Sequence, residues 1–111
     1  MSQVGPVIMG HPIARACLES GGVVYSFRTS DRTTGETHYR YERTGQKQGD
    51  VLITQETDRI LPTVDNLREF SPTSGFASAS EWREAIRDVH GDVETPGFVY
   101  RIVLLESDTD A

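Results

Sequence analysis

The chain has very little cysteine, and its histidines are scattered. Cys17 is the one cysteine, so no intramolecular disulfide can form and no multi-cysteine metal site can be built within one chain. The three histidines, His11, His38 and His90, lie far apart and match no metal-binding spacing. These absences exclude zinc-finger folds, and we expect no metal site.

Long hydrophobic runs and nucleotide-loop motifs are absent as well. No apolar run approaches the roughly 18 to 20 residues that span a bilayer, and the first residues lack the basic start and apolar stretch of a signal peptide. We therefore expect a cytoplasmic protein without membrane contact. No glycine pattern matches a Walker or dinucleotide fingerprint, and no GxSxG elbow occurs. We expect no cofactor, and nothing indicates a serine nucleophile.

Lysine is also scarce in this chain. The chain has 17 acidic and 11 basic residues, a net charge of −6, and its only lysine is Lys47. An acidic surface with few lysines resembles that of proteins adapted to high salt. It also argues against non-specific binding to nucleic acid, because that affinity comes mainly from neutralising phosphates. Any binding of nucleic acid must therefore be local.

The 111 residues are enough for one hydrophobic core but not for two, so we expect a single domain over residues 1–111, with a frayed acidic tail from about residue 107. Pro12 suits the start of a helix that Gly21 ends. The spacing of Ser78 and Glu81 predicts a capping box, and Gly91 ends the helix that follows. Trp82 lies on the apolar stripe of that helix, so we interpret it as a core residue.

Alternating and continuous apolar stretches predict four strands. They are expected over residues 23–28, 37–43, 51–57 and 98–105, with a short helix over 64–70. The first two strands are expected to form a hairpin, because a stretch rich in Ser, Asp, Thr and Gly separates them. Since the elements have no βαβ rhythm, we predict an α+β fold with a small mixed or antiparallel β-barrel and flanking short helices.

Basic residues concentrate between Arg28 and Lys47. This stretch has a net charge of +2, which leaves −8 for the rest of the chain. Arginine and tyrosine side chains on the expected hairpin could pair with phosphates and stack on bases. The alternative is that the two residue types alternate because one face is core and the other is solvated. The candidate ligand-binding residues are Ser26, Arg28, Tyr39, Arg40, Tyr41, Arg43 and Lys47.

Four segments, taken in order, resemble the ASCH family of the PUA-like superfamily. They are ACLESGGVVYSFR, QKQGDVLI, SASEWREAIRDVHGD and GFVYRIVLLE, which together cover most of residues 12–106. The family consists of small barrel domains associated with RNA and modified nucleosides. The resemblance implies the same barrel, an arginine at the end of the first strand, which Arg28 supplies, and a cleft between the barrel and the closing helix.

Some small bacterial members of that family are amidohydrolases that deacetylate acetylcytidine with a lysine, a threonine and a glutamate. The resemblance places the lysine on Val23 and the threonine on Ser26. The glutamate falls near Gly75, and the nearest carboxylates are Glu69 and Glu81. Valine can neither donate a proton nor act as a base, so one required function is missing unless Lys47 supplies it from another loop.

The leading hypothesis is an RNA- or nucleotide-binding module. In it the cleft, lined by Ser26, Arg28, Arg40 and Lys47, holds RNA or a nucleoside-like ligand. One alternative is a small amidohydrolase that acts on acylated nucleosides such as acetylcytidine. A second is a regulatory protein-interaction domain, which the acidic surface favours. The sequence makes no prediction about the oligomeric state.

Overall fold

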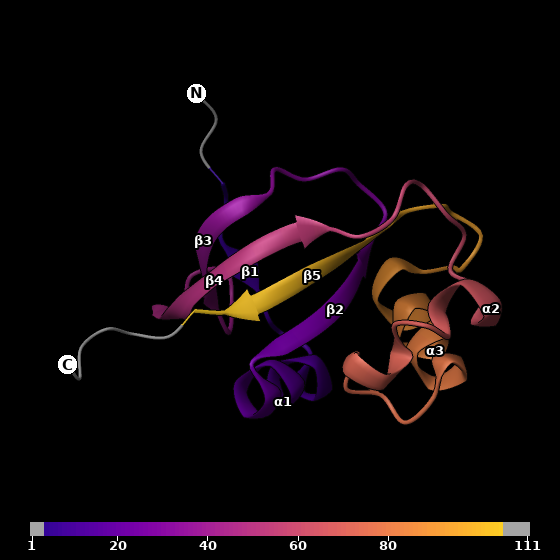
Figure 1. The fold of residues 1–111 in the computed structure, drawn as a ribbon, viewed down its shortest axis with the longest axis horizontal. Coiled ribbons are helices and arrows are strands. Elements are labelled where there is room, and N and C mark those ends of the chain that lie inside the picture. The colour runs from indigo at the N-terminus through magenta and orange to yellow at the C-terminus, as the bar shows by residue number, and fades with distance from the viewer. Residues whose placement is uncertain (1–3, 106–111) are drawn as a thin grey trace.

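A computed structural model of the protein describes residues 4–105. The acidic tail expected from about residue 107 lies outside them. The described chain contains five strands, three α-helices and one short 3₁₀ turn (Figure 1). The elements in order are β1 (Val7–Ile8), α1 (Pro12–Gly21), β2 (Val23–Arg28), β3 (Gly35–Arg40), β4 (Lys47–Gln55), α2 (Val64–Leu67), η1 (Ser71–Thr73), α3 (Ala79–His90) and β5 (Phe98–Leu104).

The strands form one curled, five-stranded mixed sheet in the order β1-β3-β4-β5-β2. All neighbouring pairs are antiparallel except β1 and β3, which are parallel. The predicted α+β fold with flanking short helices is confirmed, and the sheet is a half-barrel. Its two edge strands, β1 and β2, are not paired to each other. We call the space between these two edges the seam.

The predicted hairpin between residues 23–28 and 37–43 is wrong. β2 pairs with β5, whereas β3 pairs with β1 and β4, and β3 ends at Arg40. The physical reason lies in β5, whose nearly continuous apolar run needs a neighbour on each side to bury it. β5 therefore takes the place between β4 and β2, and residues 29–34 cross the end of the half-barrel instead of forming a tight turn.

A β-bulge interrupts the pairing of β3 with β4. The register steps from Tyr39 opposite Gly49 to Arg40 opposite Lys47, which leaves Gln48 without a partner on β3. An extra residue of this kind bends its strand and increases the local twist. The bulge therefore contributes to the curvature of the half-barrel.

Two hydrophobic cores flank the sheet. The first fills the concave side and includes Leu18 of α1, Val24 of β2 and Ile102 of β5. The second lies between β2 and β5 and the helices α2 and α3, where Phe27 and Val99 pack against Trp82. Since successive side chains on a strand point to opposite faces, β2 and β5 contribute to both cores. This arrangement explains why β5 is apolar along nearly its whole length.

The helix ends follow local chemistry. The Ser78 hydroxyl accepts a hydrogen bond from the Glu81 N–H at 3.2 Å, which confirms one half of the predicted capping box. Gly91 ends α3 with a φ of 92°, in the left-handed region that favours glycine. α1 runs through Gly21, and Gly22, not Gly21, takes the left-handed conformation at its end, with a φ of 81°. No helix within residues 4–105 is long and apolar enough to cross a membrane.

Candidate functional site

A cavity of about 630 Å³ lies at the seam, where a full barrel would close. Its volume falls inside the roughly 300 to 1,000 Å³ range of small-molecule pockets. The lining residues come from both edge strands, from the segments that flank β1, from the start of α1, from three loops and from α3. They are Pro6, Ile8, Met9, Gly10, His11, Pro12, Ala14, Tyr25, Ser26, Phe27, Arg28, Arg32, Arg43, Phe76, Trp82, Ala85, Ile86, Val89 and His90.

The edge position of β2 explains the mixed character of the cavity. Ser26 and Arg28 point to one face of β2, and Tyr25 and Phe27 point to the other, toward the helices. Because no strand pairs with the free side of β2, side chains from both faces border the same space. The cavity therefore has a basic wall on the barrel side and an aromatic wall on the helix side.

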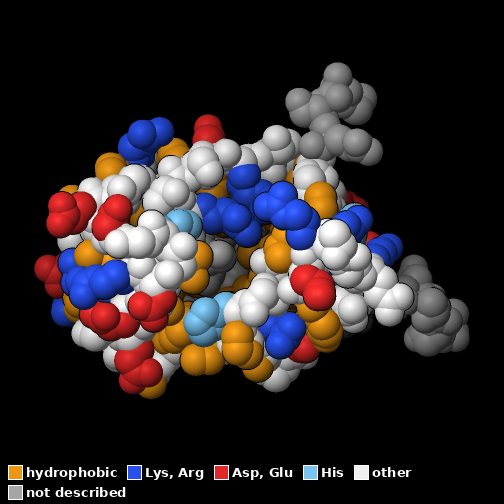
Figure 2. Space-filling model, turned by 180° about the vertical axis from the view of Figure 1, so that it is seen from behind, with side chains coloured by type: hydrophobic (Ala, Val, Ile, Leu, Met, Phe, Trp, Pro, Cys, Tyr) orange, Lys and Arg blue, Asp and Glu red, His pale blue; other side chains and the backbone are white. Residues whose placement is uncertain are grey.

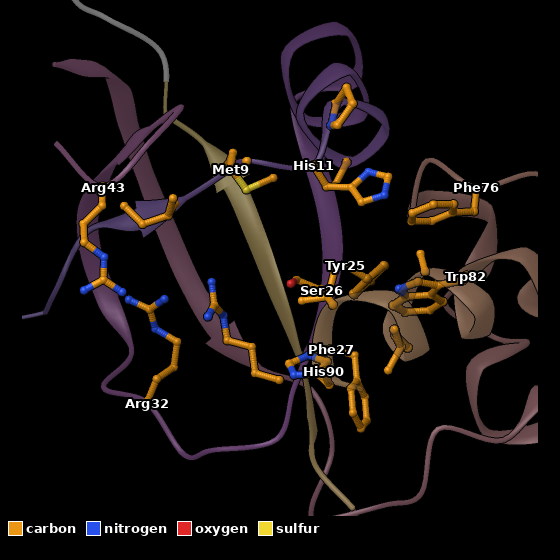
Figure 3. A pocket seen from close by; sticks show the side chains of 18 of the residues that line it. Met9, His11, Tyr25, Ser26, Phe27, Arg32, Arg43, Phe76, Trp82 and His90 are labelled. Atoms are coloured by element: carbon orange, nitrogen blue, oxygen red, sulfur yellow. The ribbon is translucent and has the colours of Figure 1, made fainter. Parts of the chain in front are cut away.

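The basic wall consists of Arg28, Arg32 and Arg43. Figure 3 shows the side chains of Arg32 and Arg43 pointing toward each other, across the cavity from Phe76 and Trp82. None of the ion pairs formed among residues 4–105 includes these three arginines. In the space-filling view, basic side chains gather along one side of a central hollow (Figure 2).

Arg28 is the most enclosed member of the basic wall. Burial lowers the pKa of its guanidinium below the ordinary value, and the neighbouring Tyr100 opposes this shift only in part. Within residues 4–105, the Arg28 side chain forms no hydrogen bond. Every buried side-chain nitrogen or oxygen atom there does have a hydrogen-bond partner, so the guanidinium nitrogens of Arg28 are not buried. Its N–H groups therefore open onto the cavity, where they are available to a ligand.

Arg32 is held in place by contacts from several elements. Its backbone N–H donates a hydrogen bond to the Tyr100 hydroxyl at 3.0 Å, and its guanidinium donates to the Gly5 carbonyl at 2.8 Å. Burial lowers the pKa of Arg32, and the like charge of Arg28 lowers it further. Two neighbouring cations that form no ion pair within residues 4–105 are suited to an anionic ligand.

The aromatic wall consists of Tyr25, Phe27, Phe76 and Trp82. Trp82 is only 3% exposed, so its predicted core position is confirmed, although it also borders the cavity. The His11 ring contacts Phe76 edge-on at 5.2 Å between ring centroids. Offset and edge-on aromatic groups of this kind offer faces on which a planar ring can pack.

The structure brings together three of the seven predicted ligand-binding residues: Ser26, Arg28 and Arg43. Arg40 does not line the cavity, and its guanidinium donates a hydrogen bond to the Arg43 carbonyl at 3.1 Å. It thus positions the loop that carries Arg43. Lys47 pairs with Asp50 at 2.8 Å on the surface and does not line the cavity.

Sequence reasoning missed Arg32 and most of the residues opposite the basic wall. Arg32 was counted in the basic stretch, but it lies in a loop that was expected to be a simple turn. Nothing in the sequence links His11 and Phe76 to Arg28. The three residues line the same cavity only because the sheet curls and the helices pack against it.

Tyr39 and Tyr41 lie away from the cavity lining and serve a different cluster. Both hydroxyls donate hydrogen bonds to Glu19 of α1, at 2.7 Å from Tyr39 and 2.6 Å from Tyr41. The Arg15 guanidinium lies over the Tyr41 ring, 4.4 Å from its centroid. Because Tyr39 is buried and belongs to β3, this cluster fastens α1 to the sheet.

The cluster gives a testable stability effect. The hydrogen bonds from Tyr41 and Tyr39 lower the pKa of Glu19, so the stabilisation is complete above the unfolded pKa of about 4.3 and is lost as the pH falls through the lower folded value. We expect Tyr39→Phe to reduce the free energy of unfolding by about 1 kcal/mol at pH 7. Urea unfolding between pH 7 and pH 3 should show this difference shrinking. A difference that stays constant across the pH range would contradict the assignment.

The positions that the resemblance assigned to catalysis are not assembled around Ser26. Gly75 packs against α1, where an added Cβ would lie 2.8 Å from the Ile13 carbonyl oxygen. Val23 pairs with Val103 on β5 and does not line the cavity. Within the described part of the chain, the lining includes no lysine, aspartate or glutamate. The lysine and carboxylate of the deacetylase chemistry therefore have no counterpart in this lining.

The described residues contain no group of three or more His, Cys, Asp or Glu side chains placed to hold a metal ion. No family model matches the chain, and neither a curated protein nor a solved structure matches it. The fold and the site thus define an α+β half-barrel with a cavity at its open seam that is basic on one side and aromatic on the other.

Proposed function

We propose that the protein is an RNA- or nucleotide-binding module whose ligand occupies the cavity at the seam. The observation that carries the proposal is the pairing of two walls in one space. Three arginines that form no ion pair within residues 4–105 share this cavity with four aromatic side chains. A nucleotide has the same two parts, an anionic phosphate and a planar base.

The chemistry of each wall fits one part of such a ligand. Guanidinium groups bind phosphate through pairs of parallel N–H donors, and these charge-assisted hydrogen bonds are stronger than neutral ones. Bases stack on aromatic side chains with about 1 to 3 kcal/mol per base. The Ser26 hydroxyl lies at the edge of β2 between the two walls, where it can donate to or accept from a sugar or base.

The proposal is tested by measuring the affinity of fluorescent single-stranded and structured RNAs, and of fluorescent nucleotides, over a salt series. We expect Arg28→Ala to weaken binding by about 10- to 100-fold, the loss that one charge-assisted hydrogen-bonding group causes. The slope of log affinity against log salt should also become shallower by about one.

The matched control is Arg68→Ala. Arg68 lies on the surface beside α2, pairs with Asp65 and does not line the cavity, so its removal changes the net charge equally. We expect this variant to bind as the unchanged protein does. Equal losses of affinity in both variants would show that binding depends only on the net charge of the protein. If no RNA or nucleotide binds at low salt, the proposal is overturned in favour of a protein partner.

A further inference from the structure

The cavity and the surface around it differ in what they can accept from a nucleic acid. The cavity volume of about 630 Å³ suits a ligand of small-molecule size. Proteins that track single strands instead hold roughly 4 to 16 nucleotides in a long basic groove. The three arginines of the basic wall line a single hollow and lie along one side of it (Figure 2).

The surroundings of the cavity are acidic. In Figure 2, acidic side chains gather over the lobe that contains α2 and α3. Residues 56–96, which include α2 and α3, hold nine acidic and four basic residues, and on α3 itself Glu81, Glu84 and Asp88 outnumber Arg83 and Arg87. A long RNA that left the cavity on this side would pass over like charges, and a ligand confined to the cavity would not.

The number of cations in the basic wall also bears on the ligand. A phosphodiester inside a strand carries one negative charge, whereas a terminal phosphate carries about 1.5 to 2 at neutral pH. Arg28, Arg32 and Arg43 meet with no carboxylate partner within residues 4–105. The start of α1, at His11 and Pro12, also borders the cavity and adds the positive end of a helix dipole.

We infer that the site is specific for a nucleotide that ends in a terminal phosphate, with the phosphate at Arg28, Arg32 and Arg43 and the base against Phe76, which, unlike Trp82, is only partly buried. This inference rests on the proposed function and narrows it. A free mononucleotide and the phosphorylated end of an RNA offer the same chemistry. In both cases the dianionic phosphate is bound, and the internal phosphodiesters of a strand are not.

The test compares matched ligands by isothermal titration calorimetry on the full chain. The ligands are the four 5′-mononucleotides, the four nucleosides, inorganic phosphate, and a short single-stranded RNA with either a 5′-phosphate or a 5′-hydroxyl. We expect the mononucleotides to bind at least 10-fold more tightly than the nucleosides, and the phosphorylated RNA at least 10-fold more tightly than its hydroxyl form. Binding of the phosphorylated RNA without binding of mononucleotides would identify the RNA end as the source and still support the inference.

Two variants separate charge from geometry. Arg32→Ala should abolish the higher affinity for phosphorylated over unphosphorylated ligands. Arg32→Lys keeps the charge but not the planar guanidinium, and it should retain part of this difference in affinity. Arg68→Ala should leave it unchanged, and circular dichroism establishes that each variant is folded. Equal affinity for nucleosides and nucleotides, or for the two RNA forms, would overturn the inference and leave the proposed function standing. Binding of none of these ligands would overturn both.

Discussion

Gly97→Ala is expected to lower the free energy of unfolding by about 3 kcal/mol or more. Gly97 is buried immediately before β5, at the point where this chain segment crosses the end of β2. A Cβ at this position would overlap the Arg28 carbonyl oxygen and would lie 2.7 Å from the Phe27 ring and 2.9 Å from the Arg28 carbonyl carbon. Since two of these atoms are backbone, rotation of a side chain cannot relieve the overlap.

The backbone of Gly97 is fixed on its other side as well. It exchanges two hydrogen bonds with Ile60, one of 2.7 Å and one of 2.8 Å. The substitution must therefore push β2 away from β5 or break this bridge. Displacing β2 also moves Arg28, so the variant is expected to lose ligand affinity in addition to stability.

Urea unfolding followed by circular dichroism measures the effect as a lower midpoint at an unchanged slope. Gly21→Ala is the control, because an added Cβ there meets no atom within 4 Å and the residue lies in helix α1. That variant should change stability by less than about 1 kcal/mol, in the stabilising direction. A Gly97→Ala protein as stable as the Gly21→Ala protein would show that β2 and β5 are not in this close contact.

Trp82→Ala is expected to cost about 3 to 5 kcal/mol, a large fraction of the roughly 5 to 15 kcal/mol that stabilises a typical domain. Trp82 is 3% exposed and belongs to the core that joins α3 to the sheet, together with Phe27 and Ile86. Its truncation would extend the cavity into that core. Trp82→Phe keeps an aromatic ring and should lose less than half as much.

The same residue offers a direct test of the site. Trp82 is the only tryptophan and it borders the cavity, so the intrinsic fluorescence of the unchanged protein should shift when a ligand binds. Stability of the two variants is measured by circular dichroism in urea, which does not depend on tryptophan. A loss below about 1 kcal/mol for Trp82→Ala would mean that α3 is held to the sheet by other contacts.

Local chemistry made much of the fold predictable. The end of α3 follows from Gly91, and its start follows from Ser78 with the N–H of Glu81, all within a few residues of one another. The strands over 23–28 and 98–105 were likewise evident from residue type and alternation. In these segments the sequence neighbours decide the conformation.

Strand pairing and the site depend on contacts between distant segments. β1 is only two residues long, between Pro6 and Gly10, and becomes a strand because it pairs with β3. Arg28 and Arg43 were predicted on neighbouring strands of a hairpin, but they meet across the seam because the half-barrel curls. Arg32 reaches the same cavity because Tyr100 of β5 holds its loop.

The bulge at Gln48 has a consequence for how ligand selection can change. Residues of both edge strands, β1 and β2, line the cavity, so its width depends in part on how strongly the strands between these edges bend. Gln48 contributes to that bend from β4, and it does not line the cavity. The size of the accepted ligand and the chemistry of its recognition are thus encoded in different residues, and either property can evolve while the other is conserved.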